Sequence, residues 1–145
     1  MTLLLDAYAV LALLKGEPAA AHVERLLETV DGGTLTALGV AEVLDHLVRL
    51  AGAAEEDAAL DVAQLGLATP DPIDGKLAAR AGLLRARNYH RRDRAVSLAD
   101  CVLAETARAR RSPVASSDPH LLDMCRDEGI DVVMLPDSHG KTWSP

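Results

Sequence analysis

Aromatic residues are scarce in this chain of 145 residues, which has no phenylalanine and carries only Tyr8, Tyr89 and Trp143. Proteins that bind single-stranded nucleic acid by stacking usually display several aromatic side chains for that purpose. If the chain binds nucleic acid, the sequence therefore favours recognition of shape and backbone. It also predicts that alanine and leucine fill the core.

Cysteine is equally sparse, since Cys101 and Cys125 occur without a CxxC motif or a histidine at ligand spacing. This pattern argues against a disulfide framework and gives no support for a zinc site. Two isolated thiols fit a reducing compartment. The first apolar run ends at Asp6 with no basic segment before it, and no stretch reaches the roughly 18 apolar residues of a membrane span. We therefore expect a cytoplasmic protein with no membrane partner.

Length and composition predict a single globular domain over residues 1–145. The chain is 49% hydrophobic and 26% charged, which is ordinary for a folded protein. A chain of this length can bury a hydrophobic core without disulfides. We expect residues 137–145, beyond the last apolar segment, to form a loose C-terminal tail.

The net charge of −7 argues against broad, sequence-independent binding to nucleic acid. The charge is unevenly distributed, however, because the segment 80–94 is rich in arginine. This segment is explained equally well as a solvated surface or as a patch that contacts phosphates, with Arg87, Arg91 and Arg92 as the candidate contacts. Its arginines are Arg80, Arg85, Arg87, Arg91, Arg92 and Arg94.

Short apolar runs alternate with helical periodicity along the whole chain. This alternation predicts an α/β fold, specifically a three-layer α/β/α sandwich with a mainly parallel central sheet. The expected strands are Leu3–Leu5, 34–37, 113–116 and 131–135. The expected helices are 7–14, 19–30, 40–51, 55–67, 73–87, 97–111 and 118–127.

Four acidic residues, Asp6, Glu42, Asp100 and Asp118, fall where an expected strand ends or an expected helix begins. In a parallel sheet the carboxyl ends of the strands meet at one edge, which is where open α/β folds bind ligands. We therefore expect the four side chains to point into one crevice. Carboxylates crowded together need a positive charge between them, so the pattern predicts a divalent metal ion.

Each acid also has a purely structural explanation. Asp6 and Asp118 are good N-cap residues, and Pro119 suits the first helical position after a cap. Ser97 and Asp100 match the capping box, in which each side chain binds the other residue's backbone N–H. Glu42 is off the apolar seam and could be a solvated glutamate near a helix start. Taken singly, each acid is explained by capping, but capping does not explain the combination.

Several segments taken together resemble the PIN-domain nucleases, and in particular the VapC toxins of bacterial toxin–antitoxin pairs. The resemblance covers the whole chain in order, spacing and length. It rests on Leu3–Leu14 (LLLDAYAVLALL), Ala41–Leu44 (AEVL), Ser97–Asp100 (SLAD) and Ser116–Asp118 (SSD).

The resemblance implies a metal-dependent endoribonuclease that leaves 5′-phosphate and 3′-hydroxyl ends. Its catalytic and metal-binding residues would be Asp6, Glu42, Asp100 and Asp118, with Mg²⁺ or Mn²⁺ as cofactor, and Ser116 would support the metal site. One position departs from the family, which commonly has Ser or Thr where this chain has Tyr8. We expect Tyr8 to pack in the first turn of its helix.

The resemblance also implies three kinds of partner. One is an RNA substrate, and another is a VapB-type antitoxin that directs a basic side chain towards the acids. The third is a second copy of the toxin, giving a homodimer that forms a heterotetramer or larger assembly with the antitoxin.

Two alternatives remain open. One is a non-catalytic PIN-like domain that binds RNA or protein. The other is a phosphoacceptor receiver domain, for which Lys15, Lys76 and Lys141 are poorly placed.

Overall fold

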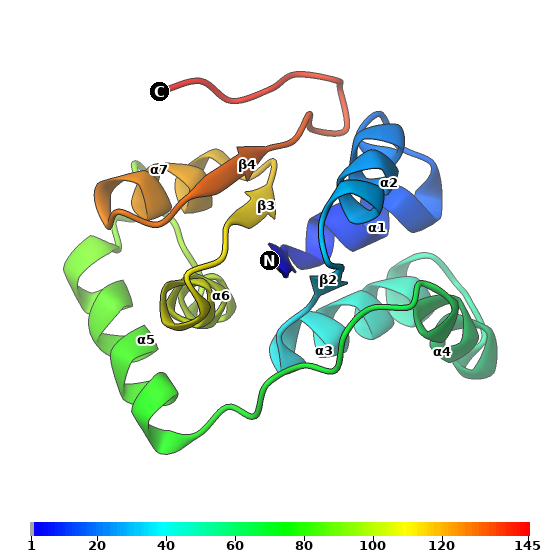
Figure 1. Cartoon of the computed structure of the whole chain (residues 1–145), viewed down its shortest axis with the longest axis horizontal. Coiled ribbons are helices and arrows are strands. Elements are labelled where there is room, and N and C mark those ends of the chain that lie inside the picture. The colour runs from blue at the N-terminus through cyan, green and yellow to red at the C-terminus, as the bar shows by residue number, and fades with distance from the viewer. Residues whose placement is uncertain (1) are drawn as a thin grey trace.

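The centre of the protein is a small parallel sheet in a computed structural model that describes residues 2–145. Its strands lie in the order β2-β1-β3-β4, and all three pairings are parallel. Figure 1 shows β3 and β4 on one side of the N-terminus, from which β1 starts, and β2 on the other. The strands are β1 (Leu3–Leu5), β2 (Gly33–Thr34), β3 (Val114–Ser116) and β4 (Val132–Met134).

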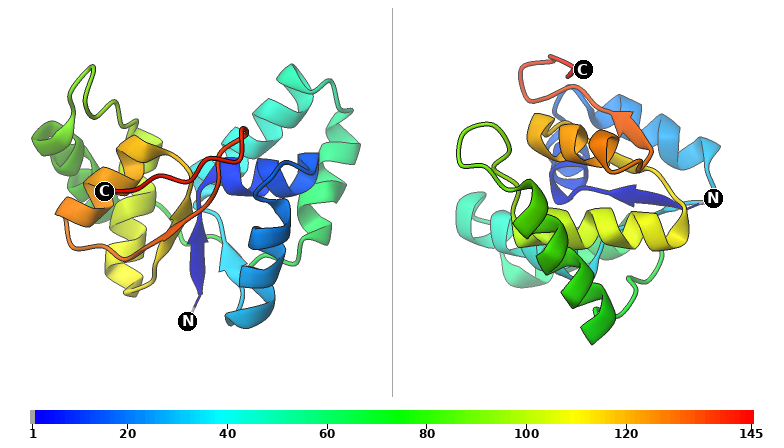
Figure 2. Two further views of the ribbon diagram at one scale, coloured as in Figure 1. Left: turned by 90° about the horizontal axis from the view of Figure 1, so that it is seen from above. Right: turned by 90° about the vertical axis from the view of Figure 1, so that its left-hand side faces the viewer.

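Helices cover both faces of this sheet, which confirms the predicted α/β/α sandwich (Figure 2). Side chains of one strand alternate between the two faces. Accordingly, Leu3 and Leu5 join a core with α1–α4, whereas Leu4 joins a second core with α5–α7. The first group is α1 (Ala7–Lys15), α2 (Ala20–Thr29), α3 (Ala37–Asp45) and α4 (Glu55–Gln64), and the second is α5 (Gly75–Asn88), α6 (Leu98–Arg110) and α7 (Pro119–Asp127).

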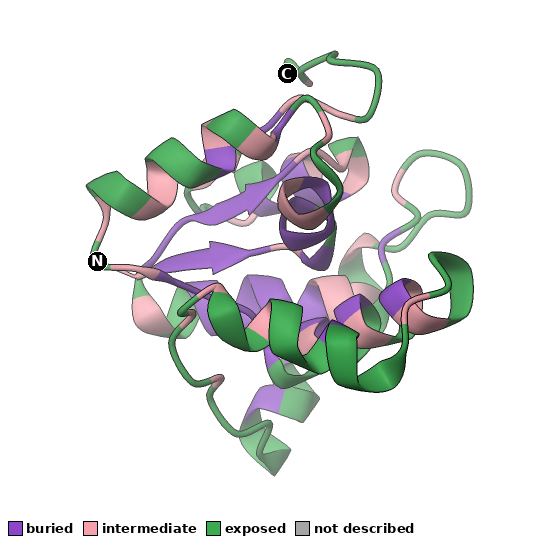
Figure 3. Ribbon diagram, turned by 90° about the vertical axis from the view of Figure 1, so that its right-hand side faces the viewer, coloured by how far each residue is buried: buried purple, intermediate pink, exposed green. Residues whose placement is uncertain are grey.

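Leucine, valine and alanine fill both cores, as the lack of phenylalanine predicted. Figure 3 shows buried residues concentrated on the strands and on the helix faces towards them, while the outer faces are exposed. The cores therefore fix the ends of β1 and β3, where two of the four acids follow.

Several boundaries differ from the sequence-based expectation by one to three residues, and the reason is clear for two of them. The second strand is Gly33–Thr34 rather than 34–37, because Thr36 accepts a hydrogen bond from Gly39 N (3.0 Å) through its Oγ1 and so begins α3. The helix expected over 55–67 ends at Gln64, since Gly66 takes a positive φ of 66°.

The helix expected over 40–51 changes its hydrogen-bonding pattern halfway along. It is α-helical to Asp45 and continues as a π-helix, η1 (His46–Leu50), with a bond of 3.0 Å from Ala51 N to His46 O. In a π-helix each hydrogen bond joins residues five apart rather than four, so one more residue lies within each turn. Such turns are frequent at functional sites.

Residues 137–145 contain no helix or strand, and part of this segment forms a closed turn. Asp137 Oδ1 accepts hydrogen bonds from the N–H groups of His139 and Lys141, both at 2.9 Å. The assignment of residues 1–145 to one domain stays a prediction. Within residues 2–145, no helix is both long enough and apolar enough to cross a membrane.

Leu4 tests how strongly the sheet depends on its middle strand. Its side chain is fully buried between β1 and α5–α7, so we expect Leu4→Ala to lower the free energy of unfolding by about 2–5 kcal/mol. Urea denaturation followed by circular dichroism measures the change. The matched control is Leu60→Ala on α4, where a leucine that is 54% exposed should change stability by less than about 0.5 kcal/mol. Equal effects of the two substitutions would contradict this account of the core.

Candidate functional site

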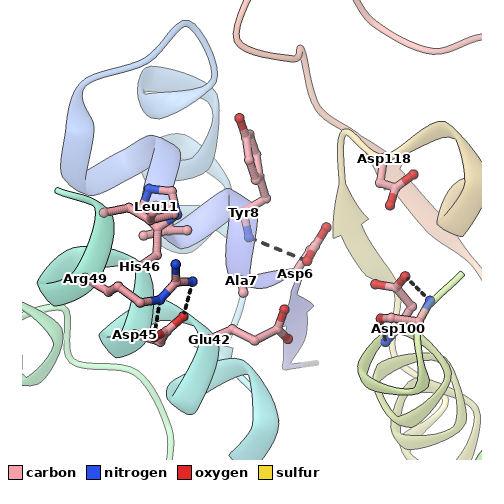
Figure 4. A pocket seen from close by; sticks show the side chains of 12 residues that line it. Asp6, Ala7, Tyr8, Leu11, Glu42, Asp45, His46, Arg49, Asp100 and Asp118 are labelled. Atoms are coloured by element: carbon pink, nitrogen blue, oxygen red, sulfur yellow. Dashed lines mark hydrogen bonds and ion pairs between the residues drawn. The ribbon is translucent and has the colours of Figure 1, made fainter.

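Asp6, Glu42, Asp100 and Asp118 line one pocket with a volume of about 390 Å³, as expected from the sheet topology. Asp6 directly follows β1, and Asp118 lies two residues after the neighbouring strand β3. Asp100 is in the first turn of α6. Figure 4 shows these side chains facing the same space from four different elements. The chain therefore concentrates four carboxylates at the carboxyl edge of its sheet.

Ser116 joins the two central acids. Its hydroxyl donates a 2.7 Å hydrogen bond to Asp6 Oδ2 and accepts one of 3.0 Å from Asp118 N. The serine is completely buried at the end of β3. It consequently sets the position of the Asp6 carboxylate relative to the backbone that carries Asp118.

All three capping explanations hold: Asp6 caps α1 and accepts from Tyr8 N (3.5 Å), and Asp100 and Asp118 serve at the starts of α6 and α7. The Ser97 N–H donates to Asp100 Oδ2 (2.8 Å) and the Asp100 N–H donates to Ser97 Oγ (3.0 Å), which completes the capping box. Asp118 Oδ1 accepts from His120 N at 2.9 Å, with Pro119 at the first helical position. At Asp100 and Asp118 the cap occupies one carboxylate oxygen, and the second oxygen has no hydrogen-bond partner among the described residues. Capping and ligand binding are thus compatible at both residues.

Glu42 differs from the other three acids. It lies in the second turn of α3, not near the helix start as we expected, and its carboxylate accepts no hydrogen bond from residues 2–145. Figure 4 shows its side chain extended into the pocket opposite Asp100. No structural role competes with ligand binding at Glu42.

The pocket disfavours negative charge on its own acids. The pKa of Asp6 is raised from 3.8 to about 7, chiefly by burial and also by the nearby charges of Asp100 and Asp118, while the Ser116 hydrogen bond opposes the change. Burial is also the main cause of the raised pKa of Glu42 and of Asp100. A cation bound among these groups would relieve their repulsion.

The four acids offer only oxygen ligands, which suit a hard cation such as Mg²⁺ or Mn²⁺. Among residues 2–145, no three His, Cys, Asp or Glu side chains form a group that could hold a metal ion directly. Mg²⁺ is usually held by one or two carboxylates and keeps several waters, so it does not need a closed cage of protein ligands. The donor set therefore fits a hydrated metal ion in a pocket wider than the ion.

Sequence reasoning missed the second wall of the pocket. Four residues there follow Glu42 at spacings of 3, 4, 7 and 8, so the periodicity that reveals a helix face would have found them. Arg49 donates two hydrogen bonds to Asp45, at 2.9 and 2.8 Å, and is the one arginine that lines this pocket. The four residues are Asp45, His46, Arg49 and Leu50.

Tyr8 contradicts our expectation that it packs in the first turn of α1. Its side chain is 42% exposed and lines the pocket, whereas its neighbours Ala7 and Ala9 are buried. The reason is helix geometry, since position 8 falls on the face of α1 that points away from the sheet.

The arginine-rich segment divides into two parts. Arg94 binds Asp123 and Asp127 (2.5 and 2.6 Å) and Arg87 binds Glu128 (3.2 Å), so both belong to an ion-pair network over α5–α7. Arg91 and Arg92 lie in an exposed turn, and their side chains make no hydrogen bond or ion pair with the described residues. The turn contacts the first turn of α7 through His120 Nδ1 and Asp93 O, 3.2 Å apart. It is therefore held beside the helix that Asp118 caps.

The raised pKa of Asp6 predicts a pH-dependent cost to stability. The unfolded carboxyl ionises near pH 4 but the folded one near pH 7, so the free energy of unfolding should fall as the pH rises between these values. In a chelator, Asp6→Asn should stabilise the protein at pH 8 by about 1–3 kcal/mol and have little effect at pH 4. Urea denaturation at several pH values, with Asp61→Asn on α4 as the exposed control, measures this. A gain that does not change with pH would contradict it.

Comparisons with known proteins were made for sequence and structure. The family model for the PIN domain matches residues 3–127. VapBC2 from Rickettsia felis, bound to a promoter DNA fragment, has a similar fold with a TM-score of 0.68 and 14% identity, over 92% of this chain and 98% of that one. FitAcB from Neisseria gonorrhoeae has a TM-score of 0.66 and 20% identity, over 90% and 95%. No curated protein sequence matches.

A further structural match is VapC20 from Mycobacterium tuberculosis, a toxin that cleaves the sarcin-ricin loop. Its TM-score is 0.66 at 14% identity, with 83% of this chain and 93% of that chain covered. At these identities the structures establish a shared fold. Together with the family model they confirm the architecture predicted from the sequence.

Proposed function

This chain belongs to the PIN domain family, and we propose that it is a VapC-type toxin, an endoribonuclease that depends on a divalent metal ion. The convergence of four carboxylates on one pocket is the observation that carries the proposal. Neither core packing nor capping requires Glu42 to face the other three acids. An enzyme that hydrolyses phosphodiesters with metal needs this arrangement.

We assign the metal to Asp6, Glu42 and Asp100, which would hold it directly or through water, with Asp118 as a further ligand, and Mg²⁺ or Mn²⁺ as the ion. Bound there, the ion supplies a water of lowered pKa and stabilises negative charge on the phosphate. Ser116 holds the Asp6 carboxylate in place, and the Ser97 cap does the same for Asp100. The chain thus contributes a preformed, negatively charged cradle for the cation.

The same cradle repels RNA when it holds no cation, so other residues must bring the substrate to the pocket. Arg91 and Arg92 are suited to this role because no acidic partner neutralises them and their turn lies beside α7. Arg87 is paired with Glu128 and is the weaker candidate. Phosphate contacts of this kind position a nucleic acid without reading its sequence.

We infer that the natural partner is a VapB-type antitoxin and that the two proteins act in the cytoplasm. Several similar structures are VapBC pairs, which supports this inference. The four acids pair with no basic side chain of residues 2–145, since Arg49 in the same pocket binds Asp45, and this favours a partner that inserts a basic side chain. We further propose a toxin homodimer that forms a heterotetramer or larger assembly with the antitoxin.

A second candidate function is a PIN-like domain that binds RNA or protein without cleaving it. It is favoured by the absence of a ready-made metal cluster within residues 2–145 and by Tyr8, which occupies the pocket edge. The two functions differ in whether metal-dependent cleavage occurs.

RNA cleavage with and without metal distinguishes them. We expect the wild type to cut RNA in Mg²⁺ or Mn²⁺ and to stop in a chelator. Asp6→Asn and Asp100→Asn should each reduce the rate by about 100-fold or more, since even residues that only support a metal ligand change activity by 10–100-fold. Asp61→Asn, an exposed acid on α4, should leave the rate unchanged. Cleavage that persists in chelator, or in Asp6→Asn, would contradict the proposal.

The arginine turn can be tested by the salt dependence of RNA binding in a chelator. Replacing Arg91 and Arg92 together by Gln should weaken binding and reduce the slope of log K against log salt by about 1.4, at roughly 0.7 for each contact to single-stranded RNA. The double substitution of Arg25 and Arg126, exposed residues on α2 and α7, removes the same charge elsewhere. If both pairs changed the slope equally, the effect would come from net charge and the assignment would be wrong.

A further inference from the structure

We propose that Tyr8 forms a binding site for a nucleobase of the RNA, beside the carboxylates and distinct from them. The inference rests on the proposed function, because the ligand that it assigns to Tyr8 is a base of the proposed RNA substrate. The acids, in contrast, face the phosphate. It starts from a side chain whose placement no part of the fold requires.

Tyr8 has no structural task in the protein. It is 42% exposed in the first turn of α1, and the core on that side is completed by Ala7, Ala9 and Val10. Its hydroxyl makes no hydrogen bond with residues 2–145. Tyrosines that are partly exposed at a pocket, with a hydroxyl that has no partner in the protein, are enriched at binding interfaces.

The position of the ring suits a base next to a phosphate held by the acids. Tyr8 is two residues from Asp6, and its backbone N–H lies 3.5 Å from Asp6 Oδ1. Figure 4 shows the ring standing at the pocket edge, with its hydroxyl directed away from the carboxylates. The face of the ring, rather than its hydroxyl, is therefore the part available to a ligand.

Two leucines line the pocket together with Tyr8. Leu11 comes from the next turn of α1 and Leu50 from the end of η1, and Leu50 is 61% exposed. Bases stack on aromatic rings regardless of their identity, because every base has a π face. A pocket that carries carboxylates together with the exposed side chains of Tyr8 and Leu50 can hold both the phosphate and the base of a nucleotide.

The test combines a change in the protein with a matching change in the RNA. An oligoribonucleotide with a mapped cleavage position is prepared intact and with one abasic residue at each nucleotide around that position. Wild type, Tyr8→Phe and Tyr8→Leu are compared on this set by kcat/KM, and by equilibrium binding in a chelator. Leu60→Ala on α4 is the control for loss of an exposed side chain far from the pocket.

We expect Tyr8→Leu to lose about tenfold in kcat/KM and in binding, while Tyr8→Phe, which keeps the ring, stays within about twofold of wild type. One abasic position should cost the wild type a similar factor and cost Tyr8→Leu almost nothing more, because the two changes remove the same contact. Leu60→Ala should behave as wild type does.

Two results would overturn the nucleobase site. One is wild-type cleavage and binding by Tyr8→Leu, which is also the result expected if the ring serves only a protein partner. The other is that the fold-losses caused by Tyr8→Leu and by the missing base multiply at every abasic position, as they would if the two changes removed independent contacts. If the wild type cleaves no RNA, the proposed function fails, and the binding comparison still decides whether Tyr8 holds a base.

Discussion

The hydrogen bond from Ser116 to Asp6 joins the two central strands at the point where the sheet ends and the pocket begins. It can form only because β1 and β3 are parallel neighbours, which places residues 110 positions apart at the same edge. The serine is fully buried, so its hydroxyl needs both of its partners, the Asp6 carboxylate and the Asp118 backbone N–H. The geometry of the acidic pocket follows from this contact and from the caps of α6 and α7.

The capping roles of the acids explain how a small protein tolerates so much negative charge in one place. A carboxylate at a helix start is stabilised by backbone N–H groups and by the helix dipole. Asp100 and Asp118 each satisfy such a group with one oxygen and leave the other towards the pocket. Structural and chemical requirements therefore select the same residue types at the same positions, and a motif search cannot separate them.

Much of the fold was predictable because its signals are local. The run Leu3–Leu5, the Ser97 capping box and the Asp118–Pro119 pair each act within a few residues, and each is confirmed. The two-residue strand β2 was misplaced, because so short a strand has no periodicity of its own. The pairing of Arg87 with Glu128, and the exposure of Tyr8, depend on contacts and orientations in the folded chain that sequence spacing does not specify.

The π-helix η1 makes the pocket wall formed by residues 45–50 sensitive to the gain or loss of a residue in a way that the walls formed by α1 and α6 are not. Substitution of a residue does not change the phase of a helix. A π turn, however, exists because one more residue is accommodated between the hydrogen-bonded groups. Loss of a single residue from 46–50 would let ordinary α-helical bonding resume, so the side chains within this turn would be redistributed around the axis while the residues beyond it kept their phase. Such a deletion would change which side chains of 46–50 face the pocket. Length variation at this one helix can therefore alter what the pocket holds without touching any of its four acids.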